Sequence, residues 1–492
     1  MKNKALLVIQ IGLVVFAGHF IAFEMFHIPK QAEFTAIFGI ALFYPVVRFP
    51  LVGVYAVFIV SPFIPFIRRL YYLVYGRPGN DPLIILGDLI VIMVFLALLF
   101  EFRRGLSEDK TVKRFMTVVG FYFGYMIVRA FVFNIAPLGD SLLRLKYYAP
   151  MVLMFFVGIY YGREFKHLKR IWTITVALGV IGGLYGIKQL FIGYSAAEKL
   201  WFSTSYFTTL FIQGVARPFS FYQSPAAFAD ALVLSTIGVV LMLGWGKFRG
   251  KILLVALIPL FFYGILITSV RSNWIGALSI FFIWFIILQM RSSGQRIAII
   301  AALFLFFVVY QLVDDTVKAD MSPDGLLNAF NGKLGKQEYV DLMVTSRTKA
   351  LTDPFAENSM LSRIALWKFL FDLTKDPELA LLGRGVGALN ADSLYVTYLA
   401  EFGYPGFIFI IGLYCAFIIL GTKSLGAVSD PRSVILIKGI IVMDLSFALM
   451  NFTGTHIHSF PGDVYFWFWN GVLMNVRPLD KKLVEESMSV AA

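Results

Sequence analysis

The sequence predicts an all-α integral membrane protein with about fourteen transmembrane helices. Composition gives the first reason, because 59% of the 492 residues are hydrophobic and 15% are charged, against roughly half and a quarter in soluble proteins. The second reason is that apolar runs such as ALLVIQIGLVVFAGHFIAF and ILLVALIPLFFYGILIT recur along nearly the whole chain. Each is long enough to cross a hydrocarbon core of about 30 Å as a helix.

Lysine and arginine collect in loops that follow every second apolar run. These basic loops are 101–114, 161–170, 244–251, 291–296, 421–433 and 476–482. Because short cytoplasmic loops carry an excess of Lys and Arg, we expect these loops and both termini to be cytoplasmic. The same bias explains the net charge of +13 without a nucleic-acid partner.

This orientation divides the chain into three parts. Residues 1–313 form N-terminal transmembrane helices with an outer loop at 193–226, and residues 392–492 form C-terminal transmembrane helices. Between them, residues 314–391 form a long hydrophilic segment on the outer side, and its second half has helical spacing of apolar residues. We therefore expect a long external helical loop.

Isolated arginines lie against apolar helix ends on the predicted outer side, at Arg144, Arg217 and Arg271, and Arg129 lies inside a predicted span. An arginine near the bilayer centre costs roughly 2.5 to 3.5 kcal/mol on insertion scales, so it usually faces a cavity, a partner or the interface. For Arg129 and Arg144, two explanations are equally good: the side chain extends to the membrane interface, or it has a functional role. A further argument singles out Arg217 and Arg271.

That argument rests on three stretches. RPFSFYQSPAAFADALVL (217–234) is an arginine followed by a turn of small residues and proline before a span, and ILITSVRSNWIGAL (265–278) has an Arg-Ser pair and an aromatic residue at the outer end of a span. After the long external loop, SRIALWKFLFDLTKDPELALLGRGVGALNADSLYVTYLAEFGYPG (362–406) combines an Arg and Trp helix, a glycine-rich turn, a polar pair and two spaced glycines. In order and topology, these stretches resemble the bacterial O-antigen ligase and O-antigen polymerase family.

The resemblance implies a type C glycosyltransferase-like fold and a hexosyltransferase-type enzyme of the bacterial inner membrane. Such an enzyme acts on undecaprenyl-diphosphate-linked oligosaccharide at the periplasmic face, among membrane lipids and possible chain-length regulators. Ligases of the family carry His where this chain has Asp392, so the resemblance favours a polysaccharide polymerase. A ligase that transfers glycan to a lipid or protein acceptor is the alternative. A polytopic transporter is the second alternative, although neither midplane helix breaks nor an internal repeat is evident.

A lipid-diphosphate donor has a negatively charged leaving group, and arginine binds phosphate oxygens bidentately while staying charged. Arg217 and Arg271 are the predicted catalytic cations, since cations aimed at developing charge are usually the largest catalytic effect. The resemblance and the outer position suggest further substrate-binding residues: Arg144, Arg363, Arg384, Tyr395, His456 and His458. We expect no cofactor. We also expect no metal, because the His-x-His pair has no nearby cysteine and its other interpretations are packing or a substrate hydrogen bond.

Two carboxylates, Asp392 and Glu401, lie near the end of the third stretch, 362–406. Asp392 has two interpretations: it caps the free N–H groups of a starting helix, or it is the general base that takes the proton from the acceptor sugar hydroxyl. Direct attack by that hydroxyl would invert the anomeric configuration. We interpret Glu401 as structural, paired with an outer arginine. The stretch Gly403-Tyr-Pro-Gly406 leaves two courses open: the helix continues straight and carries Asp392 further out, or it bends there and its first part lies along the membrane surface.

Overall fold

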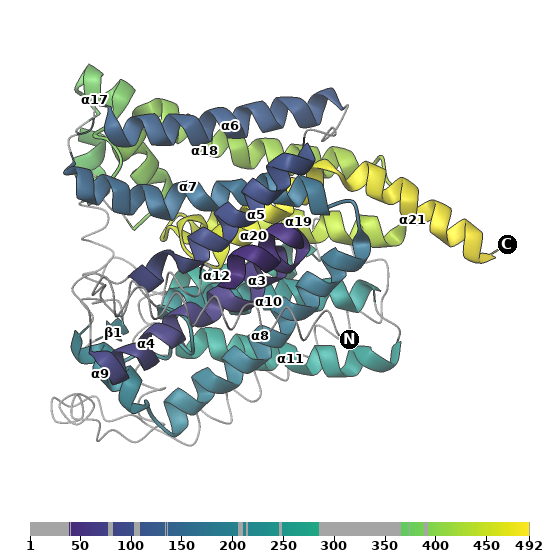
Figure 1. The fold of residues 1–492 in the computed structure, drawn as a ribbon, viewed down its shortest axis with the longest axis horizontal. Coiled ribbons are helices and arrows are strands. Elements are labelled where there is room, and N and C mark those ends of the chain that lie inside the picture. Colours follow the sequence, from purple (N-terminus) through teal and green to yellow (C-terminus); the bar gives the residue numbers. More distant parts are fainter. Residues whose placement is uncertain are drawn as a thin grey trace.

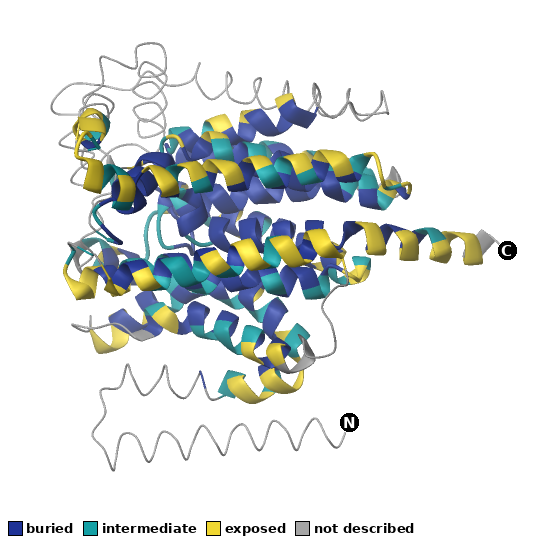
Figure 2. Cartoon of the chain, turned by 90° about the horizontal axis from the view of Figure 1, so that it is seen from above, coloured by how far each residue is buried: buried dark blue, intermediate teal, exposed yellow. Residues whose placement is uncertain are grey.

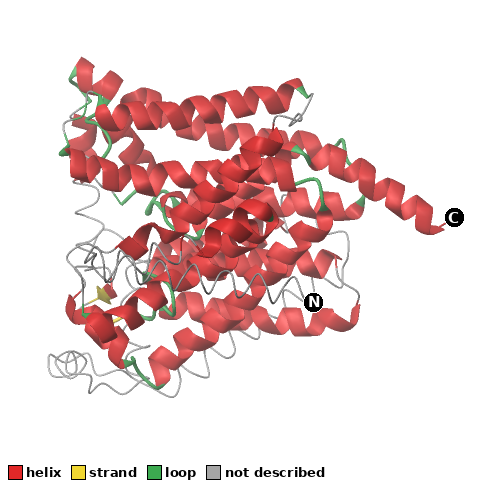
Figure 3. Ribbon diagram, viewed as in Figure 1, coloured by secondary structure: helices red, strands yellow, loops and turns green. Residues whose placement is uncertain are grey.

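The apolar runs form helices that lie alongside one another and are joined by turns at two ends (Figure 3). In the computed structural model, the structure describes residues 39, 41–76, 82–102, 109–132, 134, 136–204, 210–212, 215–245, 248–284, 366–372, 374–387 and 392–491. Arg363 and most of the expected external segment 314–391 lie outside these residues.

The elements follow one another as α3 (Pro50–Val60), η2 (Ser61–Phe63), α4 (Ile64–Tyr75), η3 (Pro82–Ile85), α5 (Leu86–Phe102), α6 (Lys110–Phe131), α7 (Leu138–Tyr161), α8 (Phe165–Phe191), α9 (Ala196–Thr204), β1 (Phe211–Ile212), β2 (Val215–Ala216), α10 (Pro225–Trp245), α11 (Phe248–Ile267), α12 (Arg271–Phe282), α17 (Pro377–Leu382), α18 (Leu394–Leu425), α19 (Pro431–Met450), η7 (His456–His458), α20 (Gly462–Met474) and α21 (Val476–Ala491). The two strands pair antiparallel.

Six helices in the described part of the chain are long and apolar enough to cross a membrane, which supports a multi-pass membrane protein. They are Pro50–Tyr75, Leu138–Tyr161, Phe165–Phe191, Pro225–Trp245, Leu394–Leu425 and Pro431–Met450. Two shorter apolar helices are Leu83–Leu99 and Lys251–Ile267. The expected number of about fourteen spans includes the stretches 5–23 and 297–313, which lie outside the described residues.

Burial divides most helices into an inner and an outer face (Figure 2). Large apolar side chains cover much of the outer face, such as Phe121 and Ile252, each 73% exposed. Monomeric soluble proteins rarely expose extensive apolar surface. A bilayer is the environment in which such a surface is stable.

Small residues allow the inner helices to approach closely. Gly158 of α7 faces Gly471 of α20, and a Cβ atom at either position would overlap the backbone of the other helix. Close approach through small residues is typical of helix packing within membranes. This contact places α20 in the centre of the bundle.

In the described part of the chain, elements that the charge bias assigns to opposite sides lie at opposite ends of the bundle. In Figure 1, α9, the ribbon containing β1, and α17 lie at the left end, whereas α21 extends from the right end. We call the left end, with the ribbon and α17, the outer end, and the right end the basic end. Those sequence-predicted site residues that the structure describes belong to the outer end.

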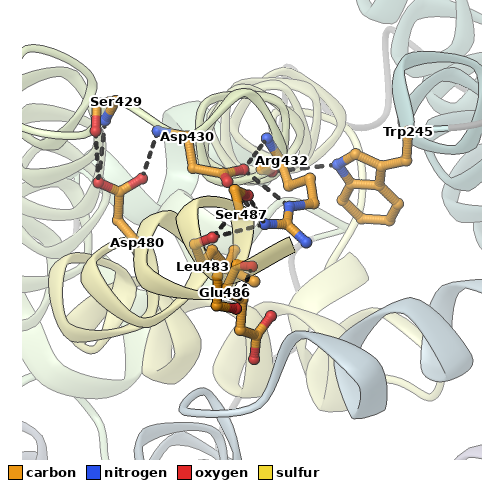
Figure 4. A network of polar contacts seen from close by, with 9 residues as sticks. Trp245, Ser429, Asp430, Arg432, Asp480, Leu483, Glu486 and Ser487 are labelled. Carbon is orange, nitrogen blue, oxygen red and sulfur yellow. Dashed lines mark hydrogen bonds and ion pairs between the residues drawn. The ribbon is translucent and has the colours of Figure 1, made fainter. Parts of the chain in front are cut away.

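A polar network fastens α21 at the basic end (Figure 4). The Arg432 guanidinium donates to Asp430 Oδ2 at 2.8 Å and to the Leu483 carbonyl at 2.9 Å. Asp480 accepts from the backbone N–H groups of Ser429 and Asp430 at 3.0 and 2.8 Å. Although burial raises the pKa of Asp430, the hydrogen bonds from Arg432 outweigh this and keep its pKa below the usual value. These contacts hold α21 against the start of α19.

Helix α18 breaks at Gly403, whose φ of 66° and ψ of −167° are not helical. Of the two courses that the sequence left open, the structure has the bend. Gly383, at the end of α17, lies so close to the Gly403 backbone that a Cβ atom on it would overlap the peptide. Arg129 strengthens the same corner by donating to the carbonyls of Val132 at 3.0 Å and Leu382 at 2.7 Å. Arg129 therefore ties α6 to α17.

Candidate functional site

The two predicted catalytic arginines lie on two segments that contact each other at the outer end. Arg217 follows strand β2, where its backbone N–H donates to the Leu210 carbonyl at 2.9 Å, and its guanidinium donates to the Thr268 carbonyl at 3.3 Å. Arg271 lies just beyond Thr268 as the first residue of α12 and is partly exposed. The hydrogen bond to Thr268 therefore joins the segment that carries Arg217 to the turn that precedes Arg271.

A buried network fixes the start of α12. His456 Nδ1 lies 2.7 Å from Asp230 Oδ1, and His456 Nε2 lies 3.0 Å from Ser272 Oγ. Asn273 Nδ2 donates to the same Asp230 oxygen at 2.6 Å. Because a carboxylate accepts, the Asp230 contact places a proton on Nδ1 of His456. These contacts join α10, α12 and η7 directly beneath Arg271.

The segment that carries Asp392 is bonded to the same region. The Leu394 N–H donates to the carbonyls of Asn451 and Gly454 at 3.0 and 2.9 Å. The side-chain oxygen of Asn451 in turn accepts from the backbone N–H of His456 at 2.7 Å. The start of α18 is therefore connected through Asn451 to the network that supports Arg271.

Asp392 itself is exposed and has a φ of 47°, in the left-handed region. The N-cap of α18 is Ser393, whose side chain makes no capping hydrogen bond. Asp392 is therefore not the N-cap residue, because the helix begins one residue too late for it. The interpretation as a general base stays a prediction.

Glu401 is the centre of a second network at the outer end. Its Oε1 accepts from Arg144 Nε at 3.2 Å and from the Gly387 N–H at 3.0 Å, and its Oε2 accepts from the Tyr148 hydroxyl at 2.7 Å. The prediction that Glu401 pairs with an outer arginine is confirmed, and the partner is Arg144. Glu401 is fully buried, so this ion pair joins α7 to α18 just before its bend.

His458 belongs to this second network and not to that of His456. Its Nε2 lies 3.1 Å from the Tyr398 hydroxyl, and its ring lies against Tyr148 with 3.9 Å between centroids. Burial, and then the charge of Arg144, lower the pKa of His458 well below its ordinary value. The imidazole is therefore neutral at physiological pH.

The two histidines of the His-x-His pair thus have separate partners. Across the residues that the structure describes, no three His, Cys, Asp or Glu side chains are grouped as metal ligands would be. Each histidine contacts neighbouring helices, and the assignment of the pair to substrate binding stays a prediction.

The other predicted binding residues have backbone partners. The Tyr395 hydroxyl donates to the Ala448 carbonyl at 2.7 Å, and the half-buried Arg384 donates its backbone N–H to the Ala400 carbonyl at 2.7 Å. Tyr395 thus ties α18 to α19, and Arg384 belongs to the turn that packs on the bend of α18. Arg363 lies outside the described residues.

Sequence reasoning missed Asp230 and Tyr148, and it gave no role to Ser272, the second residue of the Arg-Ser pair. A signal existed for Asp230, which is an acidic residue inside the apolar run 225–245, and ionisable residues within spans usually have a partner. Its partner His456 is 226 residues away, so sequence alone could not identify the pair. Tyr148 has no distinguishing local pattern.

Two comparisons with known proteins identified no relative of this chain. No protein-family model matches the chain, and no curated protein shows significant sequence similarity to it.

Proposed function

We propose that this chain is an inner-membrane glycosyltransferase that polymerises oligosaccharide units carried on undecaprenyl diphosphate. One observation carries the proposal: segments that bear Arg217, Arg271 and Asp392 are far apart in sequence and are joined by hydrogen bonds at one end of the bundle. These are the residues to which the family resemblance assigns chemistry.

The diphosphate of the donor would be held by the two arginines. As the bond from the anomeric carbon to the diphosphate oxygen breaks, both bonding electrons leave with that oxygen, and negative charge grows on the leaving group. Fixed cations stabilise this charge without reorganising. The bond from Arg217 to Thr268 and the bond from His456 to Ser272 hold the turn that carries Arg271, which supports a preorganised site.

The attacking group would be a hydroxyl of the acceptor sugar, whose oxygen forms the new bond to the anomeric carbon from the opposite side. Asp392 would take its proton. Asp392 is exposed, whereas Asp230 and His456 are buried and engaged with each other. Glu401 is buried and already accepts three hydrogen bonds. A single displacement of this kind inverts the anomeric centre and needs no metal.

Purified protein in nanodiscs, supplied with lipid-linked oligosaccharide, tests the activity. We expect a ladder of longer lipid-linked chains that persists in the presence of a chelator. Variants Arg217→Lys and Arg271→Lys should lose most of the product at normal protein levels. Loss of product on chelation and its recovery with a divalent metal would contradict the metal-independent mechanism.

A deletion strain separates polymerase from ligase. Without a polymerase, single repeat units stay on the carrier or are transferred one at a time. Without a ligase, long chains accumulate on the carrier. Long carrier-linked chains in the deletion strain would therefore refute the polymerase assignment and favour the ligase.

A further inference from the structure

A groove runs between α6 and α18 at the basic end, away from the candidate functional site. Its wider part has a volume of about 440 Å³ and also touches the ends of α20 and α21. A second part, of about 300 Å³, continues between α6 and α18 alone. The two parts share Phe115 and Ala416, so they form one continuous groove.

The wide part of the groove is positively charged. Lys423, in the last turn of α18, and Arg477, near the start of α21, both line it and are exposed. Within the described residues, neither cation pairs with a carboxylate. The carboxylate of Asp109 also lines this part, but its Oδ1 caps α6 by accepting from the Thr111 N–H at 2.7 Å.

The narrow part is apolar. It is lined by Val118 of α6 and by Phe409 and Leu413 of α18, with Arg114 at its side. At Gly412, which also lines it, a Cβ atom would meet no other atom within 4 Å. The groove therefore has room for an alkyl chain at this position.

The length of the groove matches one leaflet of a bilayer. Lys423 and Phe409 are fourteen residues apart on α18, or about 21 Å of helix at 1.5 Å per residue. One leaflet, from the headgroup region to the midplane, measures about 20 to 22 Å. A groove with cations at its wide end and apolar side chains along this length has the polarity of a phospholipid.

We propose that this groove binds one anionic phospholipid. Its phosphate lies between Lys423 and Arg477, and one acyl chain follows α18 past Gly412. A net positive lining favours an anionic headgroup over a zwitterionic one, since each nearby cation strengthens attraction to anionic lipid. The network around Arg432 keeps α21 in place and thereby fixes Arg477 at the rim.

Native mass spectrometry of the purified full-length protein, titrated with defined lipids, tests this site. Each nearby cation should strengthen binding of an anionic lipid about fivefold. The wild type should therefore retain phosphatidylglycerol at least about fivefold better than phosphatidylcholine. Replacing both cations, Lys423→Gln with Arg477→Gln, should reduce phosphatidylglycerol retention by about 25-fold. The control Lys481→Gln changes an exposed cation that does not line the groove, so it should leave retention unchanged.

A second pair of variants tests the acyl-chain part. At Gly412 an added Cβ atom meets nothing within 4 Å, so Gly412→Leu should project into the narrow part and abolish retention. Gly124→Leu, a position on α6 that also has open space and does not line the groove, should leave retention unchanged. Inorganic phosphate at the same concentration should not displace the lipid. Equal retention of the two lipids, unchanged retention in Gly412→Leu, or displacement by phosphate would each overturn the proposal.

Discussion

Asp392→Asn is the substitution that best separates chemistry from structure in the candidate site. Asp392 has a φ of 47°, and among residues other than glycine, Asn and Asp adopt this region most readily. Asn therefore keeps the backbone and the volume of the side chain while it removes the basic carboxylate. Asp392→Gly provides a second variant, because glycine adopts positive φ without steric cost.

The structure predicts a large effect on rate and a small one on stability. General-base catalysis contributes about 100- to 10,000-fold, so both variants should lose at least about 100-fold in the rate of glycosyl transfer. Since Ser393 and not Asp392 is the N-cap of α18, no capping energy is lost in Asp392→Asn. Ala is a poorer test, because a left-handed conformation costs it roughly 1 to 2 kcal/mol.

The assay is single-turnover transfer between lipid-linked oligosaccharides in nanodiscs, alongside thermal unfolding of the same preparations. We expect Asp392→Asn to unfold at the wild-type temperature and to be inactive, with donor binding retained. Transfer by Asp392→Asn within about threefold of the wild-type rate would refute the assignment of Asp392 as general base.

Three further predictions address the arginines, the orientation and the second network. Arg217→Lys keeps the charge but loses the bidentate fork, so the affinity for a lipid-diphosphate analogue should fall sharply; unchanged affinity would exclude the diphosphate role. Lys333 lies outside the described residues, and a cysteine introduced there, with Cys415 replaced by Ala, should react with an impermeant maleimide on intact spheroplasts. Labelling only after lysis would reverse the predicted orientation. Glu401→Gln removes the buried negative charge that pairs with Arg144 and should lower the free energy of unfolding by about 3 kcal/mol, as measured by thermal unfolding. Adding Arg144→Met should recover part of this loss, and no recovery would argue against the ion pair.

Local patterns were sufficient for the helices and for some of their ends. A run such as 225–245 must be helical in a bilayer because every backbone polar group needs a partner within its own segment. A bend at Gly403 was one of two courses that the sequence left open, because Pro405 lacks the N–H that a straight helix needs, and the tertiary structure decided for it. The charge of the loops likewise predicted two groups of loops, and these lie at opposite ends of the bundle.

The partners of the polar residues were decided only by the tertiary structure. Arg144 could have snorkelled to the interface, and its pairing with Glu401 depends on how α7 packs against α18. His456 and His458 are neighbours in sequence, yet they join different networks, because their side chains face different helices. Hydrophobicity places a helix in the membrane but does not determine its rotation or its neighbours. Close packing and the need to satisfy buried polar groups determine both, and these act between residues far apart in the chain.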